Sequence, residues 1–256
     1  MKCFRLKPII TKLIIILAAG AMLLPIVVTF IQSLNGGIKP YADFFLWKPM
    51  YLKSYVNSIA ISGISSILSV VGAVLAAYVF AKKKFPFRNL LFFMYVVVMM
   101  MPFQVTLLPQ YIVSKKFEIF DTYGALILPA IFAPFAVFYL TQIIKSVGND
   151  TLEAASLDTS SELVILFKIL IPNIRPGIAA AFVLSFAETW NMIEQPLILL
   201  DDKNKYPLSV MFRNIAENDN TIIFAASIMA LVIPLLLFAF FQDELIDNIG
   251  AYGLDK

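Results

Sequence analysis

The stretch Asn149–Pro176, NDTLEAASLDTSSELVILFKILIPNIRP, is a polar interruption inside an otherwise apolar chain. It carries acids, hydroxyls and two short helical patterns, whereas the sequence on either side is typical of membrane-spanning helices. Charged side chains are costly inside hydrocarbon, so this stretch is not expected there. It is also too regularly patterned for a slack linker. We therefore interpret it as a docking element outside the membrane, through which a partner moves the helices inside it.

The composition is that of a protein whose solvent is lipid. Of the 256 residues, 60% are hydrophobic and 14% are charged, and the mean hydropathy is +0.85. An average soluble domain has about 25% charged residues. The net charge of +3 is small and the basic residues are not clustered, so no nucleic acid is expected as a partner. The chain has no histidine and one cysteine, Cys3, which argues against a catalytic site, a metal site and an internal disulfide.

Six apolar stretches of about 20 residues, the length that crosses a bilayer, predict an all-α polytopic membrane protein. No stretch between them is long enough for a core of its own, so residues 1–256 are expected to form a single membrane domain. The first apolar run is longer than the core of a signal peptide and has no small-residue cleavage site, which favours a retained segment. The predicted spans are about 9–31, 55–81, 89–113, 123–145, 177–200 and 221–241.

The distribution of Lys and Arg orients the chain, because cytoplasmic loops are enriched in these residues. With the N-terminus inside, the excess is clear in the first two inner segments and modest over the whole chain. Both termini and the polar stretch are then cytoplasmic. The residues that carry this bias are Lys2, Arg5, Lys7 and Lys12 before the first span, and Lys82, Lys83, Lys84 and Arg88 after the second.

Two capping patterns divide the polar stretch into two predicted helices. Asp150 with Glu153 is a variant of the capping box, and Thr159 with Glu162 repeats the pattern directly before an apolar run. Pro172 and Pro176 are expected to end the second helix and to start the next span. The predicted helices cover about 151–157 and 160–170, with a sharp turn at 158–159.

The surface Glu153-Ala154-Ala155 is small and flat and carries one acid, which suits entry into the groove of a partner. The alternative is an amphipathic helix that rests on lipid headgroups. Such helices are usually rich in Lys and Arg, whereas this stretch is acidic, and this difference favours docking. The acids are Asp150, Glu153, Asp158 and Glu162.

Polar residues in the fifth predicted span are candidates for the wall of a solute path. Glu188, Asn191 and Gln195 fall on one helical face, at i, i+3 and i+7, with Trp190 and Glu194 close by. Ionisable groups inside a membrane helix usually face a water-filled path or a partner. Carboxylates beside an aromatic ring suit sugars in particular. The alternative, a Glu that lies near the interface or pairs with a lysine of another subunit, stays open.

The third predicted span offers a weaker candidate lining. Gln104 and Thr106 lie between Pro102 and Pro109, and two prolines this close free backbone carbonyls that need other partners. Such a break is tolerated where a helix lines a cavity.

Several separated motifs resemble those of binding-protein-dependent ABC transporter permeases, more narrowly the maltose-type carbohydrate permeases, in the subunit with six spans. The polar stretch resembles their EAA loop through Glu153-Ala154-Ala155-x-x-Asp158 and Phe167-x-x-x-Ile171-Pro172. Further matches follow in the right order, which makes the resemblance specific. They are Asn57-Ser58, Ala77-Tyr78-x-x-Ala81, Phe85-Pro86, Pro102-Phe103-Gln104-x-Thr106-x-x-Pro109-x-Tyr111, Asp121-Thr122-Tyr123-Gly124, Trp190-Asn191 and Pro196-Leu197.

This resemblance implies a permease subunit of an ATP-driven sugar importer in the bacterial inner membrane. It implies a second permease subunit, two cytoplasmic ATPase subunits, an extracytoplasmic sugar-binding protein and membrane lipid as partners. The chain has no G-x-x-x-x-G-K-[ST] phosphate loop, so ATP and Mg are expected on the ATPase and no cofactor on this chain. The residues implied to couple to the ATPase are Glu153, Ala154, Ala155, Asp158, Thr159 and Glu162.

Two departures from the family pattern stand out. Thr159 occupies the position after the Asp where the family has Gly, and the tail at 242–248 is acidic where related permeases are commonly basic.

Other function classes fit less well. In a self-sufficient secondary transporter or channel, Glu188 and Glu194 would be proton-linked sites, but many such folds contain internal repeats and none is visible here. An ABC permease for a non-sugar solute stays open. An intramembrane enzyme is disfavoured by the lack of histidine and of a Ser-Lys or paired-Asp signature.

Overall fold

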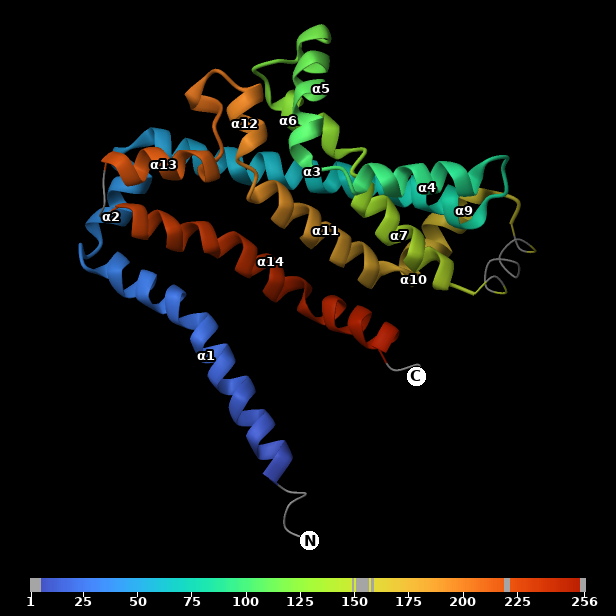
Figure 1. Cartoon of the computed structure of the whole chain (residues 1–256), viewed down its shortest axis with the longest axis horizontal. Helices are drawn as coiled ribbons and strands as arrows, with labels where there is room; N and C mark the ends of the chain where they lie inside the picture. The colour runs from blue at the N-terminus through green and yellow to red at the C-terminus, as the bar shows by residue number, and fades with distance from the viewer. Residues whose placement is uncertain (1–5, 149, 151–156, 158, 219–221, 254–256) are drawn as a thin grey trace. The chain divides into compact units, whose positions relative to one another are not determined.

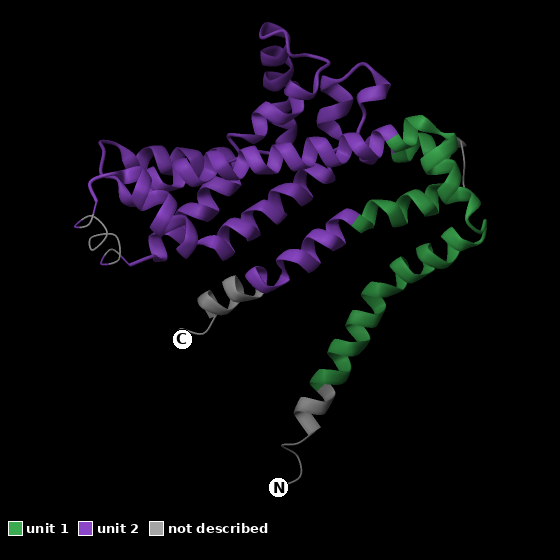
Figure 2. Cartoon of the chain, turned by 180° about the vertical axis from the view of Figure 1, so that it is seen from behind, with its two compact units in different colours: residues 1–52, 212–232 green, residues 53–211, 233–256 purple. Residues whose placement is uncertain are grey.

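The computed structural model describes residues 6–148, 150, 157, 159–218 and 222–253, and every regular element in these ranges is helical. The all-α class predicted from the composition is confirmed. The chain divides into two compact units, residues 1–52 with 212–232 and residues 53–211 with 233–256 (Figure 2). In chain order the elements are α1 (Leu6–Leu34), α2 (Lys39–Ala42), η1 (Asp43–Trp47), α3 (Pro49–Lys82), α4 (Arg88–Met99), α5 (Phe103–Lys116), α6 (Tyr123–Ala130), α7 (Pro134–Ser146), α9 (Glu162–Ile165), η2 (Leu166–Leu170), α10 (Ile171–Asn173), α11 (Arg175–Trp190), α12 (Glu194–Leu199), η3 (Lys203–Lys205), α13 (Leu208–Asn218) and α14 (Ile222–Gly253).

Four helical stretches in the described part of the chain are long and apolar enough to cross a membrane: Thr11–Leu34, Pro49–Lys82, Tyr123–Ser146 and Ile222–Leu245. Two further spans follow if each of two bent pairs counts as one span. One pair is α4 with α5, bent by 101°, and the other is Glu162–Asn173 with α11, bent by 79°. The chain therefore provides up to six crossings, of which two are broken.

The smaller unit holds α1, which continues through Pro25 without interruption. The apolar side chains of α1 from Leu13 onward are largely exposed, as expected for a helix whose surface meets lipid. Beyond α1, Phe44 is completely buried, with its ring 5.2 Å from that of Phe45 and 6.2 Å from that of Tyr51. A hydrogen bond of 2.6 Å between Ser33 Oγ and Tyr41 Oη joins the end of α1 to α2.

The core of the larger unit forms where α3 packs against α7 and η2. Ala73 and Ala77 of α3 are completely buried, as are Leu140 and Ile144 of α7 and Leu170 of η2. Alanine on α3 lets the branched side chains of the neighbouring elements approach its backbone closely. Small residues serve the same purpose between helices in membranes.

Small residues follow one another along α3, and most of them pack as a contact face. Ser58, Ser62, Ser66 and Ser69 are buried. At Gly72, a Cβ atom would lie 2.7 Å from the carbonyl oxygen of Ile131, in the connection between α6 and α7.

The third predicted span, 89–113, is interrupted, as its two prolines predicted, but the break lies at Pro102 alone. Figure 1 shows α5 leaving the direction of α4 at a steep angle. Pro102 has an extended conformation (ψ 132°) and no N–H, and a proline disfavours helical geometry in the residue before it. Pro109 lies inside α5 and does not end it.

The fifth predicted span, 177–200, is also interrupted. The helix α11 begins at Arg175 and ends at Trp190, and the chain resumes a helix only at Glu194. Asn191 follows the last helical residue. Its backbone N–H, at 3.2 Å, and its side-chain amide, at 2.7 Å, both donate to the carbonyl oxygen of Ala187.

The capping prediction at Thr159 is wrong. The helix begins at Glu162 with Ser161 as its N-cap, two residues later than predicted. Thr159 lies before the helix, where its Oγ1 accepts a hydrogen bond from the N–H of Ser161 at 3.2 Å. The helical course then runs through Pro172 and ends at Asn173. The predicted first helix, with Glu153, Ala154, Ala155 and Asp158, lies outside the described residues.

Gly72→Ala should destabilise the protein, because the added methyl group meets a backbone carbonyl that cannot move without shifting the connection between α6 and α7. A loss of about 1–3 kcal/mol is expected, as for other overpacked sites. Thermal unfolding of the purified protein in detergent measures it. Gly63→Ala is the matched control on the same helix, since a Cβ there has nothing within 4 Å. Equal stabilities of the two variants would contradict the close approach at Gly72.

Candidate functional site

A cavity of about 680 Å³ lies inside the larger unit, where the broken helices meet. Its wall comes from α3, from both sides of the breaks between α4 and α5 and between α6 and α7, and from α11, α12 and the turn between them. Six of the seven residues predicted for a solute path line it: Gln104, Thr106, Glu188, Asn191, Glu194 and Gln195.

Gln104 and Glu194 meet across this cavity, although 90 residues separate them. The side-chain amide of Gln104 donates to both carboxylate oxygens of Glu194, at 3.2 Å each. Gln104 lies in the first turn of α5 and Glu194 opens α12, so both side chains start directly after a break in a helix. The two interruptions thus bring polar groups from distant parts of the chain to one place.

The helical-face argument for Glu188, Asn191 and Gln195 needs correction. The helix ends at Trp190, so no continuous helix carries the i, i+3, i+7 relation across these residues. Glu188 reaches the cavity from the last turn of α11, Asn191 from the turn, and Gln195 from α12. They share one wall because the chain folds back at the break.

Trp190 does not line the cavity. Its ring is buried, stacked on Phe186 with centroids 5.5 Å apart and edge-on to Tyr55 at 6.1 Å. The prediction of Trp190 as a pathway residue is replaced by a packing role, in which it fixes the end of α11 against α3.

The sequence reasoning missed polar residues of α3 and α5 in the cavity wall. Ser65 and Ser69 line it, and their hydroxyls are buried without a hydrogen-bond partner among the described residues. The Oε1 atom of Gln110 is in the same state. Buried polar atoms normally find a partner, which marks these as groups able to bond a solute or water. The regular spacing of serines along α3 is the signal by which the sequence could have indicated them.

The described wall of the cavity is acidic. It contains two carboxylates, Glu188 and Glu194, and neither Lys nor Arg is among its residues. The surrounding polar groups are hydroxyls and amides, which can both donate and accept hydrogen bonds.

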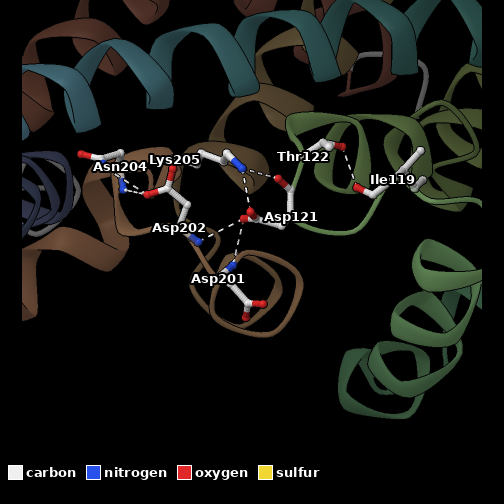
Figure 3. Close-up of polar contacts among 7 residues, drawn as sticks. All are labelled: Ile119, Asp121, Thr122, Asp201, Asp202, Asn204 and Lys205. Carbon is white, nitrogen blue, oxygen red and sulfur yellow. Dashed lines mark hydrogen bonds and ion pairs between the residues drawn. The ribbon is translucent and has the colours of Figure 1, made fainter.

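A second polar constellation holds the loop 201–207 (Figure 3). Asp121, between α5 and α6, is its centre and has a left-handed backbone (φ 55°). Its Oδ1 accepts from the backbone N–H groups of Asp201 at 3.0 Å and Asp202 at 3.1 Å. Its Oδ2 forms an ion pair with Lys205 Nζ at 2.7 Å.

The charges at this constellation shift both pKa values in the direction that keeps the pair ionised. The hydrogen bond from Lys205, with those from the two backbone N–H groups, lowers the pKa of Asp121. The same bond to Asp121 raises the pKa of Lys205. The loop is thus tied to α6 by charge-assisted bonds.

Residues near the start of α3 also hold this loop, through hydrogen bonds of Asn57 and Ser58. The side-chain amide of Asn57 donates to the carbonyl oxygens of Asn204 at 2.9 Å and Tyr206 at 3.2 Å. Ser58 Oγ accepts from the N–H of Leu208 at 2.7 Å. Tyr123 Oη donates to Asn57 Oδ1 at 2.9 Å, which joins α6 to this arrangement.

Of the six residues predicted to couple to an ATPase, the structure describes Thr159 and Glu162. Glu162 opens α9 and forms an ion pair with Lys83, in the basic turn after α3. Within the described ranges, no three His, Cys, Asp or Glu side chains are placed to hold a metal ion.

The comparison with protein families decides the class of this fold. Residues 69–248 match the family described as the binding-protein-dependent transport system inner membrane component. The chain belongs to this family. It is therefore a multi-pass permease component of an ABC transport system, as the motifs predicted, and the self-sufficient transporter and the intramembrane enzyme are set aside.

Individual relatives agree with this assignment. The arabinooligosaccharide transport permease AraQ of Halalkalibacterium halodurans is 31% identical over 208 residues, 80% of this chain and 75% of the relative. The sn-glycerol-3-phosphate transport permease UgpE of Pectobacterium atrosepticum is 28% identical over 198 residues, 75% of this chain and 69% of the relative. A solved bacterial ABC transporter, which imports the acidic polysaccharide alginate, shares the fold. It superposes with a TM-score of 0.82 at 19% identity, over 96% of this permease and 98% of that chain.

Asp121→Asn should release the loop 201–207, because an amide keeps a hydrogen-bond acceptor but loses the ion pair to Lys205. The same release is expected in the wild type at low pH. The lowered pKa of Asp121 stabilises the loop above the pKa of an unperturbed Asp, and this contribution is lost as pH falls through the lower, folded value. A spin label at residue 203, in a Cys3→Ser background, reports this mobility.

Glu118→Gln is the matched control, because this exposed carboxylate lies three residues from Asp121. Circular dichroism at each pH separates loop release from global unfolding. A label equally immobile in the wild type and in Asp121→Asn would contradict the assigned role of Asp121.

Proposed function

We propose that this permease forms half of the translocation path of an ATP-driven importer for neutral, hydroxyl-rich solutes, oligosaccharides in the first place. The cavity between the broken helices is its part of the path. The observation that carries this proposal is the pairing of Gln104 with Glu194 in a wall that also holds Glu188. Carboxylate and amide oxygens accept hydrogen bonds from sugar hydroxyls, and the amide can donate in return.

The broken helices support a path at this position. Irregular backbone at membrane depth is tolerated where it lines a water-filled cavity, and ionisable side chains within spans usually face such a cavity. The wall includes residues on both sides of the breaks after Met99 and Trp190. Backbone groups freed by these interruptions can thus reach water or solute.

The charge of the wall narrows the solute class. Two of the related proteins carry anions by name, sn-glycerol 3-phosphate and the acidic polysaccharide alginate. Two carboxylates and no Lys or Arg among the described wall residues would repel such solutes in a medium of low polarity. The arabinooligosaccharides named for AraQ are the better precedent.

The assembly follows from membership in the family. We infer a heterodimer with a second permease, two ATPase subunits that carry ATP and Mg, an extracytoplasmic sugar-binding protein and an inner-membrane location. Both termini and the stretch 149–176 then lie in the cytoplasm. The coupling contact is assigned to Glu153, Ala154, Ala155, Asp158, Thr159 and Glu162, and the chain as a whole to one permease domain of six spans.

Purification of this permease from its native membrane should yield an ATPase in stable association. ATP hydrolysis by the purified complex is expected to rise when its solute-loaded binding protein is added, because docking outside drives closure inside. A colorimetric phosphate assay measures the rise. Transport by this chain alone in liposomes would contradict the proposal.

Glu153→Ala is the informative variant in the same assay. It is expected to weaken the association of the ATPase or to leave ATP hydrolysis uncoupled from uptake. Asp201→Asn serves as its control, since this exposed carboxylate lies in the outer loop. Unchanged coupling in Glu153→Ala would remove the docking role of the EAA surface.

Glu188→Ala and Glu194→Ala should each reduce solute uptake while the complex still assembles. Loss of Glu194 also leaves the Gln104 amide without its acceptor, so the larger defect is expected there. Uptake of radiolabelled neutral oligosaccharide into proteoliposomes measures both effects.

Glu118→Ala is the control for removal of a carboxylate outside the cavity. If transport is unchanged in both cavity variants, the pathway assignment is wrong. If instead the two permeases no longer co-purify, the carboxylates pair with the partner subunit, which is the alternative interpretation.

A further inference from the structure

Two lysines at the end of α3 contact residues on either side of the segment 148–161. Lys82 Nζ donates to the carbonyl oxygen of Val147 at 2.7 Å, one residue after α7 ends. Lys83 Nζ forms an ion pair with Glu162, the first residue of α9. Adjacent residues of one turn thus contact both sides of the segment 148–161.

The turn that carries these lysines is itself braced. The guanidinium of Arg88 donates to the carbonyl oxygen of Lys83 at 3.1 Å. Lys83 Nζ lies 5.3 Å from the centre of the Tyr78 ring, one turn earlier on α3. Phe87 has a left-handed backbone (φ 60°) and caps α4, which sharpens the exit from the turn. These contacts fix the position of the turn that carries the ammonium groups of Lys82 and Lys83.

The other end of α3 within the larger unit holds the loop 201–207 through Asn57 and Ser58. Between Ser58 and Lys82 the helix has no proline and no break. At 1.5 Å per residue this stretch is roughly 36 Å long. The pairs α4 with α5, α6 with α7, and α11 with α12 are all interrupted around the cavity, whereas α3 is continuous.

We propose that α3 is a rigid rod that links the outer loop 201–207 to the segment 148–161, called the coupling segment below. Lys82 and Lys83 are the positioning residues, because they hold Val147 and Glu162 on either side of this segment. The inference rests on the proposed function, in which the segment docks into an ATPase. A displacement of the outer loop, such as docking of a binding protein could cause, would then pass along α3 to Val147 and Glu162 as one movement.

Stability alone does not account for the ion pair. The side chains of Lys83 and Glu162 are 34% and 59% exposed, and exposed pairs contribute little to folding. Glu162 raises the pKa of Lys83 through their hydrogen bond, so the ammonium group of Lys83 stays charged at neutral pH. Removal of one charge should therefore leave the fold intact and change where the coupling segment sits.

A simpler role for these lysines is attraction to the cytoplasmic side and its anionic lipids. Lys84 provides the matched control for this alternative. It is exposed, it lies in the same turn and it carries the same charge. A lipid or topology effect should follow the charge of the turn, whereas a positioning effect should follow the contact with Glu162.

The test uses the complete complex in proteoliposomes and measures ATP hydrolysed per solute imported. Lys83→Gln and Glu162→Gln should each raise this ratio several-fold, and Lys84→Gln should leave it at the wild-type value. The exchanged pair Lys83→Glu with Glu162→Lys should restore the ratio. Lys82→Met, which removes the donor to Val147, should also raise it.

Asn57→Ala tests the far end of the rod. It should lower the stimulation of ATP hydrolysis by the loaded binding protein, because the outer loop loses two of its hydrogen bonds to α3 and keeps only the one to Ser58.

The outcomes are distinguishable. If the wild-type complex shows no stimulation by a binding protein, the proposed function fails. The wild-type complex can be stimulated by the binding protein while Lys83→Gln shows the same ratio of ATP to solute as Lys84→Gln. That result, or an exchanged pair that does not restore the ratio, contradicts the role of α3 and leaves the proposed function standing. If Lys83→Gln loses the ATPase subunit, the exchanged pair should regain it, and failure to regain it also overturns the rod.

Discussion

Close packing along α3 is the constraint on which the larger unit depends. Ala73 and Ala77 bring the backbone of α3 against α7, and Gly72 brings it against the connection between α6 and α7. In a membrane, apolar burial gives helices little reason to associate, so contact at short distance has to supply the attraction. The helix α7 and the connection between α6 and α7 can approach the backbone of α3 this closely only because α3 has small residues at the contact. The packing in turn holds α3 straight while its neighbours bend.

The bends have a physical cause and a chemical result. A backbone in hydrocarbon must satisfy its own hydrogen bonds, so a helix can stop only where other groups or water replace them. Two helices end at the cavity, beside Pro102 and Asn191, and the Asn191 side chain gives the carbonyl oxygen of Ala187 a second donor. The interruptions then aim Gln104 and Glu194 at each other. The polar wall of the cavity is thus a consequence of where the helices break.

Charged groups gather at the two ends of α3 and not along its packed centre. At one end Asp121 and Lys205 fasten the loop 201–207, with Asn57 and Ser58 beneath it. At the other end Lys82 contacts Val147 and Lys83 contacts Glu162, on either side of the segment 148–161. Water and headgroups at the membrane surfaces tolerate these charges, whereas the lipid-filled middle does not. Because α3 is unbroken between these two ends, a displacement at one end of the helix is transmitted to the other end.

The sequence by itself determined the helical class, the family and six of the residues that line the cavity. Hydropathy over about 20 residues depends on local composition, and the motifs around Asp121, Trp190 and Glu153 are short and ordered along the chain, so both are visible without a fold. The tertiary structure alone decided that Pro109 leaves α5 unbroken, that the fifth span breaks after Trp190, and that Ser65 and Ser69 face the cavity. The fold likewise decided that the Trp190 ring packs against Phe186. It also decided that α9 begins at Glu162, beside Lys83, and not after Thr159. Several of these features depend on contacts between distant parts of the chain, such as Lys83 with Glu162, 79 positions apart. A pattern that is read along one helix does not contain such contacts.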